Sequence, residues 1–167
     1  MDKQKLKSCL SQFGEFSVAA ELNRRGVSAS VTYGNQKCTD VVALADDGRY
    51  AIIEVKTTKE KGFPTGLDKA KQQVSIPNRF WVVVATSIDS EIHESAYYVL
   101  TDKEVKAIQA DEDKKYNESY KKKHGVDYMK KGVPTISIKR LSGHPNALNA
   151  WNKIADFLSC KEMPGAC

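Results

Sequence analysis

The first part of the chain carries a helical pattern of apolar positions. Apolar side chains that recur at 100° per residue predict a helix over residues 3 to 25, which a glycine after two arginines ends. Glu15 falls in a second, smaller apolar arc with Val18 and Leu22, so we do not expect its carboxylate to be simply solvated. The larger arc comprises Leu6, Cys9, Leu10, Phe13, Phe16, Ser17 and Ala20.

Strand patterns follow this helix. Two apolar runs over residues 39–45 and 49–57 flank Asp46-Asp47-Gly48, a composition typical of a hairpin turn. These two runs are therefore expected to pair as neighbouring antiparallel strands. Other strands are predicted over residues 27–32, 80–86, 96–100 and, as an edge strand, 135–139.

Further helices are predicted beyond the hairpin. Thr101 to Glu104 form a capping box, which begins a helix that reaches Ala110 or further. A short helix is expected over Leu67–Val74, and a closing helix over residues 146–160. Strands and helices in this order predict the α/β class, with a mixed sheet flanked by helices. Because we find neither a repeat nor a long linker, residues 1–167 are expected to form a single domain.

Composition narrows the class of protein. With 41% hydrophobic and 28% charged residues, the chain is expected to fold as a globular domain and not as a collagen-like, mucin-like or disordered one. No stretch approaches the roughly 20 apolar residues of a membrane helix. The basic N-terminal residues lack an apolar core, so we expect no secretory signal and a cytoplasmic location.

Zinc is not expected. The four cysteines form no CxxC pair, and the three histidines show no ligand spacing. In a reducing cytosol the cysteines are expected to be free thiols.

The charge is unevenly distributed. Residues 114 to 140 hold nine Lys or Arg and two acids, a local charge of +7, whereas the rest of the chain carries −2. Tyr116, Tyr120 and Tyr128 lie within this segment, and such a basic stretch suits contact with phosphates and some stacking. A solvated helix face remains the alternative, so charge alone does not decide the partner.

The register of the hairpin brings polar groups together. If Gly48 takes the left-handed position of a three-residue loop, Asp40 falls opposite Glu54 on one face. Lys56 points to that face too, because side chains alternate along a strand. A two-residue loop would instead place Asp40 opposite Val55. The three-residue register therefore predicts a cluster of Asp40, Glu54 and Lys56.

Such a cluster has a recognisable chemistry. Two opposed carboxylates repel unless a cation lies between them, and oxygen ligands without His or Cys suit Mg²⁺ or Mn²⁺. A lysine beside such a metal can orient or deprotonate water for attack on a phosphodiester. Glu-x-Lys alone is also found on ordinary surface strands, in which case Asp40 and Glu54 would lie on different faces.

The order of these residues resembles the PD-(D/E)XK nuclease superfamily. Gly14-Glu15 in a first helix, Thr39-Asp40 on one strand and Glu54-Val55-Lys56 on the next are similar to its motifs, above all in the Holliday-junction-resolvase-like and small restriction-endonuclease-like branch. The resemblance implies a restriction-endonuclease-like αβββαβ core. Thr39 stands where the family's name has proline, a position at which many members depart.

The resemblance also implies roles for individual residues. Asp40 and Glu54 would hold Mg²⁺ or Mn²⁺ together with the main-chain carbonyl of Val55. Lys56 would position and activate the water, and Glu15 would assist through a water or a second metal. Gln72 and Gln73 match a position that some members use, although an exposed helix face is the favoured interpretation for both.

Two functions remain open from the sequence. The first is a Mg²⁺-dependent endodeoxyribonuclease acting on nucleic acid, with double-stranded DNA as the expected substrate. The second is a catalytically inactive module on the same fold that binds nucleic acid or a protein partner. A homodimer would serve the cutting of two strands, although no sequence feature identifies a dimer surface.

Overall fold

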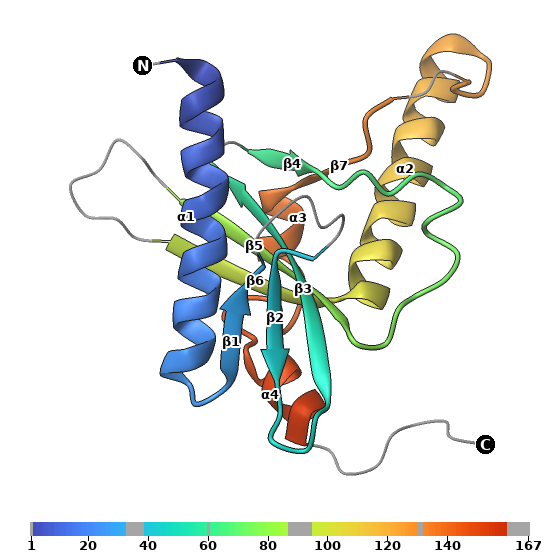
Figure 1. The fold of residues 1–167 in the computed structure, drawn as a ribbon. Helices are drawn as coiled ribbons and strands as arrows, with labels where there is room; N and C mark the ends of the chain where they lie inside the picture. The colour runs from blue at the N-terminus through green and yellow to red at the C-terminus, as the bar shows by residue number, and fades with distance from the viewer. Residues whose placement is uncertain (1, 33–38, 60, 87–94, 130–131, 160–167) are drawn as a thin grey trace, which may run out of the picture.

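A mixed five-stranded sheet separates two groups of helices (Figure 1). The computed structural model describes residues 2–32, 39–59, 61–86, 95–129 and 132–159. One apolar core joins the sheet to α1 and α4, and a second joins its other face to α2 and α3. The elements are α1 (Lys3–Arg24), β1 (Ser28–Val31), β2 (Val41–Leu44), β3 (Tyr50–Thr58), β4 (Gly62–Pro64), β5 (Arg79–Thr86), β6 (Ser95–Thr101), α2 (Asp102–His124), β7 (Thr135–Ser137), α3 (Ile138–Ser142) and α4 (Asn152–Ser159).

The sheet has the strand order β1-β2-β3-β5-β6. Its first three strands form an antiparallel meander, β5 lies parallel to β3, and β6 returns antiparallel to β5. The predicted α/β class and the mixed sheet flanked by helices are therefore confirmed. No helix in the described part of the chain is long and apolar enough to cross a membrane.

The loop of the β2–β3 hairpin has the predicted three residues. The amide of Ala45 donates to the carbonyl of Arg49 at 2.9 Å, and Gly48 has a φ of 87°. Glycine adopts this left-handed conformation at little energetic cost, so the three-residue loop is favoured. The length of the loop then fixes the register of the two strands. That register continues to the pair Val41–Ile53 at the start of β2.

The helix predicted over Leu67–Val74 does not form. Residues 65–78 make the crossover between β3 and β5 as turns and irregular chain. Leu67 is buried, whereas Val74 is 73% exposed, so a helix here would have no continuous apolar face to pack. Side-chain bonds hold the segment instead, because Gln72 donates to the carbonyl of Leu67 and to the carboxylate of Asp113.

A small second sheet was not predicted. Strand β4 lies in a stretch whose composition suggested a loop, and it pairs antiparallel with β7. The segment predicted as an edge strand over 135–139 ends after Ser137, which caps the short helix α3 through its hydroxyl. Three-residue strands carry too few positions to show an alternating pattern.

The closing helix is shorter than predicted. Asn146 and Asn149 have φ values of 56° and 51°, so the chain turns there, and α4 begins only at Asn152. Asparagine tolerates the left-handed region better than other residues with side chains, because its amide can bond to nearby backbone. The expected end of this helix at Cys160 lies outside the described residues.

Helix α1 buries its smaller apolar arc. Val18, Ala19 and Leu22 pack against the sheet, whereas Phe13 and Phe16 of the larger arc are 42% and 50% exposed. The helix therefore turns toward the sheet the side on which Glu15 lies, and not the side with most apolar residues. Cys9 is a free, exposed thiol of the larger arc, and the other three cysteines lie outside the described residues.

Close packing of α1 on β3 depends on Gly14. This glycine is buried, and a Cβ atom added to it would overlap Oγ1 of Thr57 and come within 3.0 Å of the Cβ of Thr57. We therefore expect Gly14→Ala to lower the free energy of unfolding by about 1–3 kcal/mol in urea titrations, as overpacking does. Combining it with Thr57→Ala should recover most of the loss, and no rescue would contradict this account of the contact.

Candidate active site

Asp40 lies beside Glu54 at the start of β2. Its main-chain amide donates to the carbonyl of Ile53 at 3.0 Å, and its carboxylate oxygen Oδ2 accepts from the amide of Val55 at 2.7 Å. These two bonds bracket Glu54, in agreement with the register of the hairpin. Asp40 therefore lies next to Glu54 along the edge of β3, as the three-residue loop predicts, whereas a shared site for the two carboxylates stays a prediction.

Glu54 and Lys56 form an ion pair on one face of β3. The ammonium Nζ of Lys56 lies 2.9 Å from Oε1 of Glu54. Glu54 is only 8% exposed, and a carboxylate so far removed from water needs a cation nearby. Lys56 keeps 30% of its side chain exposed, so its ammonium group stays accessible from solvent.

Among the described residues, no strand pairs with β3 on the β2 side beyond Ile53. Strand β2 pairs only with Tyr50–Ile53, whereas β3 continues to Thr58. In an antiparallel pair the N–H and C=O of one residue point to the same neighbour, so the carbonyl of Val55 points to the side from which Asp40 reaches its amide. Two carboxylates and a carbonyl, all hard oxygen donors, can therefore face one edge and fit a cation such as Mg²⁺.

Glu15 approaches from the other face of the sheet. Helix α1 packs on the face that carries Val55, opposite to Glu54 and Lys56. Burial raises the pKa of Glu15; the hydroxyl of Ser11 opposes this shift and the nearby charge of Asp40 adds to it. Within the described residues, no three His, Cys, Asp or Glu side chains form a metal-binding group. The structure thus pairs Glu54 with Lys56, binds Asp40 to the adjacent Val55 main chain and places Glu15 near Asp40.

Trp81 is a site residue that the sequence did not reveal. It pairs with Glu54 across the parallel strands, and Nζ of Lys56 lies 5.7 Å from the centre of its ring. A cation over an indole face is attracted by the ring, so Trp81 helps to hold the ammonium of Lys56. The only sequence signal was an aromatic residue in an apolar strand, which also describes an ordinary core residue.

A buried carboxylate fixes Trp81 in turn. Asp102 is 1% exposed and accepts from the indole Nε1 at 3.0 Å, from the amide of Ile76 at 2.8 Å and from Lys106 at 2.6 Å. Burial acts to raise the pKa of Asp102, but the bonds from Lys106, Ile76 and Trp81 outweigh it and the pKa is lowered. Asp102 therefore links the start of α2 to the ring beneath Lys56.

Removing this charge should destabilise the fold. Asp102→Asn leaves the buried ammonium of Lys106 without its counter-charge, and breaking such a pair costs roughly 3–5 kcal/mol. Because the folded pKa of Asp102 is lowered, its contribution is complete above the ordinary aspartate range and is lost as the pH falls through the lowered value. Urea titrations between neutral and acid pH should show a shallower pH dependence in Asp102→Asn than in wild type. The exposed Asp156→Asn is the control, and equal losses in both variants would contradict the expectation.

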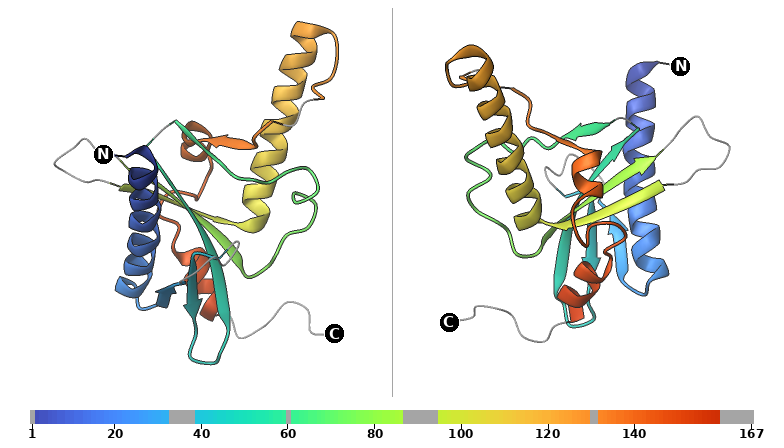
Figure 2. Two further views of the ribbon diagram at one scale, coloured as in Figure 1. Left: turned by 45° about the horizontal axis from the view of Figure 1, so that its top comes forward. Right: turned by 180° about the vertical axis from the view of Figure 1, so that it is seen from behind.

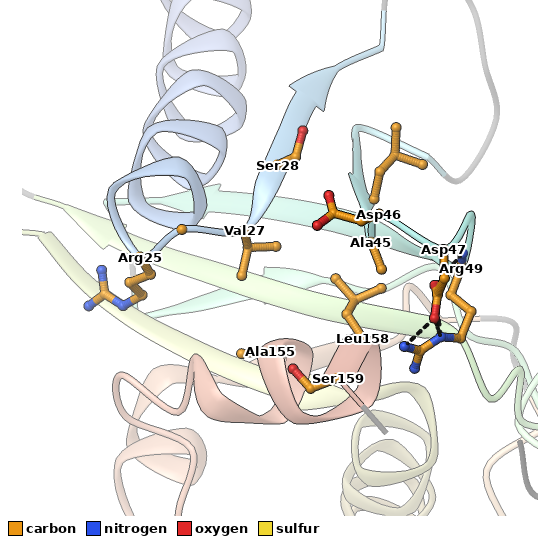
Figure 3. A pocket seen from close by; sticks show the side chains of 12 residues that line it. Arg25, Val27, Ser28, Ala45, Asp46, Asp47, Arg49, Ala155, Leu158 and Ser159 are labelled. Atoms are coloured by element: carbon orange, nitrogen blue, oxygen red, sulfur yellow. Dashed lines mark hydrogen bonds and ion pairs between the residues drawn. The ribbon is translucent and has the colours of Figure 1, made fainter. Parts of the chain in front are cut away.

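A cavity among the described residues lies away from this site (Figure 3). It measures about 430 Å³ and is lined by residues of the β2–β3 turn, the end of α1 and α4. Arg49 within it is bound to the carboxylate of Asp47 at 2.7 Å and donates to the carbonyl of Phe157. The cavity adjoins the end of β2, whereas Asp40 precedes its start, so the two sites lie at opposite ends of the hairpin.

The other two predicted candidates, Gln72 and Gln73, lie on the crossover between β3 and β5. Gln72 bridges the crossover to Asp113 of α2, and its exposed-helix interpretation is wrong because no helix forms there. Gln73 is exposed on the same crossover. Among the described residues, neither glutamine side chain forms a hydrogen bond with Asp40, Glu54 or Lys56.

Comparisons with known proteins give similarity in arrangement alone. No protein-family model matches the chain, and no curated protein is significantly similar to it in sequence. Among solved structures, it is similar to Hjc, a Holliday junction resolvase from the archaeal hyperthermophile Archaeoglobus fulgidus, with a TM-score of 0.43 and 15% identity over 79% of this chain and 87% of that one. It is also similar to a bacterial homing endonuclease, with a TM-score of 0.49 and 11% identity over 97% and 100% of the two chains.

Proposed function

We propose that this protein is a divalent-metal-dependent nuclease that hydrolyses phosphodiester bonds of double-stranded DNA. The observation that supports the proposal most directly is the position of Asp40, whose amide bonds to Ile53 and whose carboxylate bonds to Val55, on either side of Glu54 at the edge of β3. Lys56 forms an ion pair with Glu54 and lies over the ring of Trp81, so its ammonium group is placed to interact with a phosphate at this site.

Each group has a distinct task in this proposal. Asp40, Glu54 and the Val55 carbonyl would hold Mg²⁺ or Mn²⁺, which would supply charge stabilisation at the phosphate and lower the pKa of water. The Lys56 ammonium would orient the attacking water and offset the charge that develops on the phosphate oxygens. Glu15, beside Asp40, would bind a water at the outer side of the site.

The alternative is a module on this fold that binds nucleic acid or a protein partner without cutting. Such a module would need neither Asp40 and Glu54 nor Lys56. The buried carboxylate of Glu54 and its ion pair with Lys56 would then have no functional role. We also propose a cytoplasmic location and a homodimer, and both are independent of the site residues described above.

A cleavage panel tests the proposal. Purified protein is incubated with supercoiled plasmid, linear duplex, a four-way junction and an RNA duplex, each with Mg²⁺, Mn²⁺ or EDTA. We expect cleavage of at least one DNA substrate with Mg²⁺ or Mn²⁺ and none with EDTA. A folded protein that binds DNA and cuts nothing would favour the binding module, and cleavage in EDTA would exclude the metal mechanism.

A further inference from the structure

The second half of α2 projects from the molecule as an arm (Figures 1 and 2). Buried residues of this helix end at Gln109, and no residue from 110 to 129 is buried. A helix advances 1.5 Å per residue, so residues 110–124 extend about 20 Å beyond the last buried turn. We call residues 114–129 the α2 arm.

The chain after α2 folds back along the arm. Gly125 ends the helix with a φ of 75°, and Asn117 then holds the returning segment. The side-chain Nδ2 of Asn117 donates to the carboxylate of Asp127 at 3.0 Å. Its side-chain Oδ1 accepts from the main-chain amide of Tyr128 at 2.7 Å. The arm is therefore a closed helical unit and not a frayed helix end.

Aromatic rings complete this unit. The ring of Tyr128 lies 5.0 Å from that of Tyr116 and 5.1 Å from that of Tyr120, both edge to face, and His124 lies 4.3 Å from Tyr120. Such ring pairs favour a fixed arrangement. Because the rings pack on one another, they hold the arm in one arrangement, and the base stacking that the sequence suggested stays a prediction.

Charge on the arm exceeds what its own acids balance. It holds five lysines and two acids, a net charge of +3. Lys121 pairs with Asp127 at 3.3 Å, whereas Lys122 and Lys123 have no acidic partner among the described residues. Arg140, the last basic residue of the predicted segment, is bound to Asp111 and Glu112 at the base of the arm and does not share its free charge.

We propose that the α2 arm is a docking element for duplex DNA that binds backbone phosphates away from the cleavage site. Figures 1 and 2 show its free end pointing to the same end of the molecule as the carboxyl end of β3, to which Lys56 belongs. Free ammonium groups on a rigid helix suit phosphates of either strand without reading bases. The inference rests on the proposed function only for the identity of the ligand, the duplex on which the site acts.

The test is binding in the absence of any metal. Fluorescence anisotropy in EDTA compares wild type with Lys122→Gln/Lys123→Gln on a duplex of about 30 base pairs. We expect roughly tenfold weaker binding near 0.1 M salt and a salt slope smaller by about two, because each lysine neutralises one phosphate. The control is Arg24→Gln/Lys103→Gln, which removes two positive charges from exposed positions at the last residue of α1 and in the first turn of α2.

A second variant tests rigidity without changing charge. Tyr128→Ala removes the ring that joins the returning segment to the helix, whereas Tyr128→Phe keeps it. We expect weaker binding in Tyr128→Ala and wild-type binding in Tyr128→Phe. Melting temperatures should change little in either, because the arm lies outside both cores.

The outcomes separate this inference from the proposed function. Arm variants that bind like wild type, or a control pair that loses as much affinity, would overturn the docking role even if the protein cuts DNA. Arm-dependent binding by a protein that cuts nothing would support the docking role and remove the nuclease. Failure of wild type to bind any duplex in EDTA would overturn the arm's role outright.

Discussion

Lys56→Ala is expected to lower the single-turnover rate of DNA cleavage by roughly 100- to 1,000-fold, as loss of one preorganised stabilising group does. The ammonium lies 2.9 Å from Glu54 and over the Trp81 ring, so it is held at the edge that Asp40 also occupies. Alanine removes the positive charge, and neither Glu54 nor Trp81 can supply one in its place. The measurement is the rate of plasmid nicking with protein in excess and saturating Mg²⁺.

Two comparisons make the Lys56 result specific. Lys103→Ala removes an exposed lysine from the first turn of α2, which forms none of the Lys56 contacts described above, and should cut at the wild-type rate. Binding in EDTA should change far less in Lys56→Ala than the cleavage rate does, because one phosphate contact accounts for a small part of the affinity. A Lys56→Ala protein that nicks plasmid as fast as wild type would refute the role given to this residue.

Glu54→Gln is expected to abolish metal-dependent cleavage and to weaken Mn²⁺ binding. The substitution keeps the shape of a side chain that is 8% exposed, and it removes the charge that a divalent cation requires. We expect the affinity to fall by more than the roughly 10- to 100-fold seen when groups that merely orient metal ligands are removed. Isothermal titration of Mn²⁺ into the protein measures the change without any DNA.

Asp40→Asn is the companion variant on the other side of the site. Its Oδ1 can still accept from the amide of Val55, so the strand should stay in place while one ligand charge is removed. The exposed Asp156→Asn controls for a general change of charge and should titrate like wild type. Unchanged Mn²⁺ binding in both Glu54→Gln and Asp40→Asn would place the metal elsewhere.

The hairpin was predictable because its loop determines its register. Asp46-Asp47-Gly48 sets a three-residue turn, and that length alone decides whether Glu54 or Val55 faces Asp40. Trp81 could not be found in the same way. A parallel crossover leaves the register of β5 against β3 unconstrained by any short loop, so its pairing with Glu54 emerges only in the folded chain.

Elsewhere tertiary packing overrode the local pattern. The larger apolar arc of α1 predicted the helix, but Gly14 allows close approach only on the side of the smaller arc. Over Leu67–Val74 the apolar spacing suggested a helix that nothing in the sheet can cover, as the exposed Val74 shows. In both cases the periodicity can be read from the sequence. The surface available for packing then determines whether a helix forms and which of its faces is buried.

The proposed function depends on a divalent cation bound between Asp40 and Glu54 at the edge of β3. Iron-directed cleavage of the polypeptide tests this most directly, because Fe²⁺ in a Mg²⁺ site generates radicals that cut the nearby main chain when ascorbate and peroxide are added. We predict cuts at residues 39–41 and 54–56, competed by Mg²⁺, retained in Lys56→Ala and absent in Glu54→Gln. Cuts confined to other segments, or a pattern that Glu54→Gln leaves intact, would contradict the claim.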